Sequence, residues 1–144
     1  VVKTFSQKPA EVVREWYVID ASQASFGRIA TKAASLLIGK GKPGFTPHVD
    51  GGDFVIIINA DKMIVTGGKQ EKKRYYYHSG YPGGLREKTM SQVGSVGVIE
   101  EAVRGMLPVN KLRRGRLARL KVYAGSEHGH SAQKPITLSM KGGN

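Results

Sequence analysis

Basic side chains crowd the stretch from Gly105 to Pro135, where their chemistry favours binding to a polyanion. Glu127 is the only acidic residue of this stretch, so ion pairs within a helix do not balance the charge. Arginine's guanidinium fork matches phosphate oxygens in pairs, and we therefore expect the phosphates of a nucleic acid as its partner. The predicted contact residues here are Lys111, Arg113, Arg114, Arg116, Arg119, Lys121, His128 and His130.

The same stretch carries an apolar pattern of helical spacing. Arg113 and Arg116 fall within the apolar arc, so we expect them either to snorkel out to solvent or to project into the polyanion. The alternative is a solvated basic helix that only covers a core. The apolar arc, which predicts a core-facing helix, consists of Val109, Leu112, Leu117 and Leu120.

Further cations lie in two earlier segments, residues 40–48 and 69–86. The second segment begins strongly basic and runs directly into three tyrosines, Tyr75 to Tyr77. Tyrosines beside cations can stack on unpaired bases, and they can equally be ordinary packing residues of a strand; both readings stay open. The predicted contact residues of these segments are Lys40, Lys42, His48, Lys69, Lys72, Lys73, Arg74, His78 and Arg86.

The glycines between Gly39 and Gly44 match the pattern G-x-G-x-x-G, which in another setting indicates dinucleotide binding. That fingerprint requires a strand before it and a helix after it. Here it follows a predicted helix and contains Pro43, so we interpret it as a flexible basic loop.

Two strands and a helix must position these side chains. Residues 16–20 predict a short strand, and residues 26–38 predict an amphipathic helix that ends at Gly39. The continuous apolar run at residues 53–58 is typical of a strand buried on both faces of a parallel sheet. Together they predict a right-handed βαβ unit, with the two strands adjacent and parallel. A further helix is predicted over residues 98–107.

Length and composition favour one α/β domain over residues 1–144, with an N-terminal arm at 1–15 and an unpatterned C-terminal tail at 136–144. The chain has no cysteine, no apolar run of membrane-spanning length and no signal-peptide pattern near its start, so cytosol is the expected compartment. Residues 1–61 hold seven Lys/Arg against six Asp/Glu, whereas residues 62–144 hold sixteen against five. We therefore expect a scaffold half and a contact half.

No residue pattern argues for catalysis, a cofactor or a small-molecule substrate. His128 and His130 make a poor metal site without further ligands, so no metal is expected. Four aspartates could gather at strand ends, as in α/β enzymes, or could cap helices and turns, which is the commoner use: Asp20, Asp50, Asp53 and Asp61.

Several short strings along the chain carry a family resemblance. They are Trp16–Asp20, Phe26–Ala30, Thr46–Asp50, Asn59–Lys62, Thr66–Gly67, His78–Gly80, Gly83–Gly84, Gly105–Pro108, Leu120–Gly125, Glu127–His128 and Ala132–Pro135. In this order they resemble the bacterial form of the thirteenth protein of the large ribosomal subunit, from about Lys3 to Pro135.

The resemblance implies a three-layer α/β/α domain around a small, mainly parallel sheet of Rossmann-like topology. It also implies that the chain binds large-subunit ribosomal RNA beside neighbouring ribosomal proteins in the cytoplasm, supports early subunit assembly and is not an enzyme. Two departures stand out: Arg113 replaces a small residue, and residues 91–97 are shorter and richer in glycine than usual.

Two rival classes remain: a nucleotide-using enzyme and a DNA-compacting protein. The enzyme would need a phosphate-binding glycine turn after the first strand, and residues 20–25 supply none. A compacting protein would bind duplex DNA as readily as structured RNA. If the cluster between Arg113 and Arg119 contacts RNA, replacing its four arginines with Gln should weaken binding and leave the fold intact.

Overall fold

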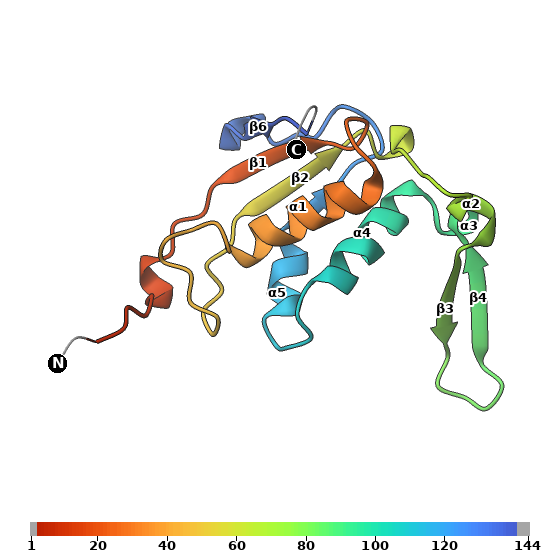
Figure 1. The fold of residues 1–144 in the computed structure, drawn as a ribbon, viewed down its shortest axis with the longest axis horizontal. Coiled ribbons are helices and arrows are strands. Elements are labelled where there is room, and N and C mark those ends of the chain that lie inside the picture. The colour runs from red at the N-terminus through yellow and green to blue at the C-terminus, as the bar shows by residue number, and fades with distance from the viewer. Residues whose placement is uncertain (1–2, 141–144) are drawn as a thin grey trace.

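The computed structural model describes residues 3–140, which form a four-stranded sheet with helices packed against it and a separate hairpin (Figure 1). The strands are β1 (Trp16–Asp20), β2 (Phe54–Ile58), β3 (Arg74–His78), β4 (Leu85–Thr89), β5 (Leu120–Val122) and β6 (Ile136–Leu138). The α-helices are α1 (Phe26–Ile38), α2 (Lys69–Lys72), α3 (Met90–Val93), α4 (Ser95–Met106) and α5 (Arg113–Ala118). Short 3-10 helices are η1 (Pro9–Glu11), η2 (Ala60–Lys62) and η3 (Ser131–Gln133).

The main sheet has the strand order β5-β2-β1-β6, and all of its pairings are parallel. Trp16 is paired with Phe54 and Asp20 with Ile58, so the predicted adjacent, parallel strands joined through a helix are confirmed. β2 is buried because its apolar side chains face packed layers on both sides of the sheet.

Helices α1 and α4 lie side by side on one face of the sheet (Figure 1). The buried face of α1, including Ile29 and Leu37, meets Ile19, Val55 and Ile57 of the strands. Burying one such side chain contributes about 1.5–3 kcal/mol. α1 ends where predicted, because Gly39 adopts the left-handed conformation with φ 85° and donates its N–H to the Ser35 carbonyl.

Aromatic side chains occupy the opposite face of the sheet. The rings of Trp16 and Phe54 stack with centroids 4.2 Å apart, and the ring of His130, just before η3, lies 5.2 Å from that of Trp16. The fold is therefore the three-layer α/β/α arrangement around a parallel sheet that the resemblance implied.

The predicted core-facing helix over residues 109–120 is wrong in its extent. α5 is only six residues long, Val109 is 87% exposed, and Leu120 belongs to β5. The turn after Pro108 delays the helix, since the Asn110 side chain accepts a hydrogen bond from the Leu112 N–H. β5 then begins two residues after the helix ends.

The predicted C-terminal tail and N-terminal arm both contact the body of the domain. Residues 136–138, the first part of the predicted tail, form β6 beside β1; its last part, residues 141–144, lies outside the described residues. The arm lies along the domain surface: the Gln7 N–H donates to Thr46 Oγ1, and the Glu15 N–H donates to Asp53.

Residues 90–97, which departed from the family pattern, form two helical pieces around a glycine. Thr89 and Gln92 make a capping box that starts α3. Gly94 then takes φ 87°, a conformation that favours glycine, and α4 begins at Ser95. The predicted helix thus begins three residues earlier than expected.

Strands β3 and β4 form an antiparallel hairpin that projects from the body of the domain (Figure 1). At its base, Tyr75 packs against a small cluster made by Phe26, Met90 and Val98. The hairpin is therefore anchored at one end, and its other end extends into solvent.

Candidate nucleic-acid interface

The projecting hairpin and helix α2 carry the densest group of exposed cations. Between Lys69 and Thr89 the chain has six Lys/Arg against two acidic residues, Glu71 and Glu87. The structure leaves all six cations exposed: Lys69, Lys72, Lys73, Arg74, Arg86 and Lys88. Five of them were predicted contact residues, and Lys88 joins them because its register opposite Tyr75 places it among the others.

The three consecutive tyrosines alternate between the two faces of the hairpin, as strand residues must. Tyr75 packs toward the body, with the Lys73 Nζ 5.5 Å from its ring centroid. Tyr77 is 39% exposed and lies beneath the Lys88 Nζ, also at 5.5 Å. Tyr76 is 63% exposed on the other face. Ordinary packing therefore accounts for Tyr75 but not for Tyr76.

Arg119 is buried, although the sequence predicts it as a contact residue for an external polyanion. It is 7% exposed, and its guanidinium forms a bidentate pair with the carboxylate of Asp50. It also donates to the carbonyls of Leu37, at 2.8 Å, and Asp53, at 3.3 Å. Every one of these partners lies within the domain, so Arg119 joins α1, the loop before β2 and β5 into one unit.

Arg116 and Arg14 complete a cluster around the same carboxylate. Arg116 is 1% exposed, and its Nε lies 3.7 Å from Asp50 Oδ1; the Arg14 Nη1 lies 3.9 Å from that oxygen. Burial, and secondarily the nearby Arg119 cation, lower the pKa of Arg14. The inference that only an external anion could balance this charge is therefore wrong for Arg116 and Arg119. Their partner is Asp50, more than sixty positions away in the sequence.

Two more predicted contact residues are partly taken up by internal bonds. Lys42 pairs with Asp53 at 2.8 Å and donates to the carbonyls of Val13 and Gly51. Arg113 donates to the Arg104 carbonyl at 2.6 Å. By contrast, Lys40, Lys111 and Arg114 are exposed, and Lys121 is half-buried.

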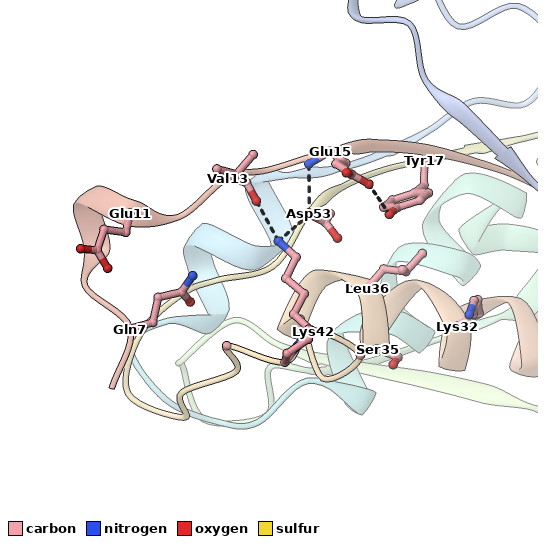
Figure 2. A pocket seen from close by; sticks show the side chains of 14 residues that line it. Gln7, Glu11, Val13, Glu15, Tyr17, Lys32, Ser35, Leu36, Lys42 and Asp53 are labelled. Atoms are coloured by element: carbon pink, nitrogen blue, oxygen red, sulfur yellow. Dashed lines mark hydrogen bonds and ion pairs between the residues drawn. The ribbon is translucent and has the colours of Figure 1, made fainter. Parts of the chain in front are cut away.

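A cleft of about 530 Å³ lies beneath the N-terminal arm, between it and the end of α1 (Figure 2). Its polar side chains bond to one another: Lys42 to Asp53, and the Tyr17 hydroxyl to Glu15 at 2.5 Å. The Glu15 hydrogen bond raises the pKa of Tyr17 to about 12, with burial adding to it. The cleft therefore functions as a seam that attaches the arm, because Lys42, Asp53 and Glu15 are already bonded across it.

Two of the predicted histidines lie apart from the others, whereas His128 and His130 are neighbours. His48 is exposed, and His78 Nδ1 accepts the Gly80 N–H in the hairpin turn. The His130 ring Nε2 is hydrogen-bonded to the Tyr123 hydroxyl at 2.7 Å, and the His130 main-chain N–H donates to His128 Nδ1. Among residues 3–140, no group of three or more His, Cys, Asp or Glu is placed to hold a metal ion.

The Asp50 cluster should make the free energy of unfolding depend on pH. Burial raises the pKa of Asp50, but the Arg119 hydrogen bonds and the surrounding guanidinium charges outweigh it, so the net pKa is lowered from 3.8. A lowered carboxyl pKa stabilises the folded state above its unfolded value, and this stability is lost as the pH falls through the folded value.

We therefore expect the free energy of unfolding to fall as the pH drops below about 4, and to fall less steeply in Asp50→Asn. Urea denaturation at a series of pH values measures this slope. Asp20, whose pKa is also lowered by its Ser22 hydrogen bonds despite burial, should retain part of the slope in the variant. Identical slopes in both proteins would contradict the assignment to Asp50.

In the part of the chain that the structure describes, no helix has the length and apolar character needed to cross a membrane. A parallel α/β scaffold, internally paired charges around Asp50 and a projecting cationic hairpin define a basic α/β protein that presents exposed positive charge.

Comparison with known proteins identifies the family. Residues 14–129 match the model of the family described as Ribosomal protein L13. The large ribosomal subunit protein uL13 of Syntrophomonas wolfei subsp. wolfei is 56% identical, covering 98% of this chain and 100% of its own length. The uL13 proteins of Alcanivorax borkumensis and Neisseria gonorrhoeae are each 53% identical over 96% and 97% of this chain and their full lengths.

The chain therefore belongs to the ribosomal protein L13 family, and the predicted resemblance is confirmed. The family consists of structural, non-enzymatic components of the large ribosomal subunit, which is cytoplasmic in bacteria.

Proposed function

We propose that this protein binds large-subunit ribosomal RNA through its exposed cations, with the hairpin unit (residues 69–89) as the principal contact, and supports early assembly of the subunit. Neighbouring large-subunit proteins are its expected protein partners. The observation that carries the proposal is the hairpin unit's six exposed Lys/Arg against two acidic residues, on a segment that projects away from the body.

The arrangement of the other exposed cations supports the same function. The loop after α1, the loop before α5 and the hairpin extend toward the same side of the domain, the lower side of Figure 1. The two loops carry Lys40 and Lys111, and Arg114 follows in the first turn of α5. Cations brought to one side from distant segments suit a continuous polyanion, because phosphates along one RNA backbone can reach all of them.

Neutralising the cluster at the base of the hairpin should reduce the salt dependence of RNA binding. We expect a variant with Lys69, Lys72, Lys73 and Arg74 replaced by Gln to bind a large-subunit RNA fragment more weakly. Each lost phosphate contact changes the slope of log K against log salt by roughly 0.7, so four should flatten it by about 3. A salt titration measures the slope, and circular dichroism confirms folding.

A matched control removes the same charge from the scaffold half. Lys3, Lys8, Arg28 and Lys32 are also exposed, so replacing them with Gln lowers the net charge equally. Equal flattening in both variants would show that only net charge matters and would contradict a localised interface.

Competition with duplex DNA separates this proposal from the DNA-compacting alternative. A protein whose cations are arranged for folded RNA should release the ribosomal fragment only at a large excess of duplex DNA. Equal competition, base for base, would favour the compacting class.

A further inference from the structure

The outer part of the hairpin exposes large apolar and aromatic side chains in an otherwise highly charged region. Tyr76 is 63% exposed, Tyr81 in the turn is 75% exposed, and Leu85 at the start of β4 is 63% exposed. Exposed apolar groups gathered in one place usually mark a contact surface. The domain core does not explain them, since among residues 3–140 the hairpin side chain that packs against a core cluster is Tyr75, at the base.

The strand register shows which of these side chains share a face. Side chains alternate along β3, so Tyr76 lies on the same face as Arg74 and His78, and opposite to Tyr75 and Tyr77. His78 is paired with Leu85, which places Leu85 on this face too, diagonal to Tyr76. Because Tyr75 turns toward the body, the Tyr76 face is directed away from it.

Charged side chains lie on and around this aromatic face. Glu87 is paired with Tyr76 and shares its face, so the cations that could bind phosphate lie to one side of it and on the opposite face. Arg74 lies on the same face as Tyr76, and its Nη1 is held by the Glu71 carbonyl at 2.7 Å. Arg86 and Lys88 extend from the neighbouring strand on the other face. A flat ring with cations within one side-chain length can accept a base on its face while the phosphates of the same strand pair with the cations.

We propose that the Tyr76 face of the hairpin, together with Tyr81, is a stacking site for unpaired bases of RNA; this rests on the RNA binding proposed above. A duplex keeps its base faces stacked internally, so it would use only the cations. A neighbouring protein is the other chemical class that could cover exposed tyrosines. The surplus of six cations over two acids favours a polyanion over a protein surface of mixed charge.

The test replaces Tyr76 with Val and Tyr81 with Leu in the full chain, removing both rings but keeping apolar side chains suited to a strand and a turn. The probe is a single-stranded RNA of mixed sequence that contains 2-aminopurine, whose fluorescence is quenched on stacking. We expect each lost ring to weaken single-strand binding roughly 5- to 100-fold, to reduce the quenching, and to leave affinity for the same sequence as a duplex unchanged.

Tyr77→Leu is the matched control, since it removes a ring from the opposite face and should leave the quenching intact. The single variant Tyr81→Ala, altered only in the exposed turn, provides the test if the double variant does not fold.

Unchanged single-strand affinity and quenching in a folded variant would overturn the stacking site while leaving RNA binding in place. A wild-type protein that does not bind the single strand would also overturn the site, and one that fails to bind the large-subunit RNA fragment as well would overturn the proposed function itself. Equal losses for single strand and duplex would also overturn the site, because bases hidden in a duplex cannot stack on these rings.

Discussion

Replacing Arg119 with Gln is expected to lower the free energy of unfolding by about 3–5 kcal/mol, as breaking a buried ion pair does. Arg119 is the only side chain that bonds both oxygens of Asp50 and two main-chain carbonyls within residues 3–140. Gln is shorter and neutral, so it can neither reach all of these acceptors nor balance the half-buried Asp50 carboxylate. Since a domain of this kind is stabilised by only about 5–15 kcal/mol, the loss is a large fraction of the total.

Urea denaturation followed by circular dichroism measures the effect. Arg114→Gln is the control, because Arg114 lies in the same helix but is exposed; its change should stay within about 0.5 kcal/mol. If both variants lost the same small amount, the Asp50 cluster would not be a stabilising element.

The expected loss of stability also affects the four-arginine variant that the sequence suggests as a test of RNA binding. The sequence predicts that a variant with Arg113, Arg114, Arg116 and Arg119 all replaced by Gln keeps its fold. The structure makes that expectation wrong, because two of the four are buried against Asp50. Weak RNA binding by such a variant would report unfolding, so the RNA contacts of this stretch must be tested at Lys111 and Arg114 alone.

Gly52→Ala should be the second strongly destabilising change. A Cβ at this position would overlap the carbonyl oxygen of Leu37 and lie 2.9 Å from the Arg119 Nη2. The oxygen belongs to the main chain of α1 and cannot move without displacing the helix, so we expect a loss at the upper end of about 1–3 kcal/mol or beyond it. Thermal and urea unfolding both measure this loss.

Gly105→Ala offers the matched control, with the same chemical change in open space. A Cβ at Gly105 meets no atom within 4 Å, and the residue lies in α4. Alanine is the better helix former, so this variant should gain about 0.5–1 kcal/mol. Opposite signs for the two substitutions would show that close packing, not glycine flexibility, makes position 52 critical; a neutral Gly52→Ala would contradict this.

Local sequence pattern determined the central βαβ unit of this protein. The apolar run of β2 and the helical periodicity of α1 each restrict a short segment to one structure, and Gly39 supplies the left-handed residue that ends the helix. Since neither apolar face can remain in water, the two strands and the helix must pack as they do. The surplus of cations in the second half also followed directly from the residues.

Tertiary structure alone decided which cations are available to a partner. Arg116 and Arg114 are two positions apart and chemically identical, yet one is buried and the other exposed. The difference arises from Asp50, which the fold brings from a distant loop to the end of α5, and no local pattern encodes that approach. β6 is a similar case: Ile136–Leu138 is too short to show periodicity, and its strand structure depends on the open edge that β1 provides. Long-range pairing satisfies buried charges and main-chain groups, and those partners are absent from any window of local sequence.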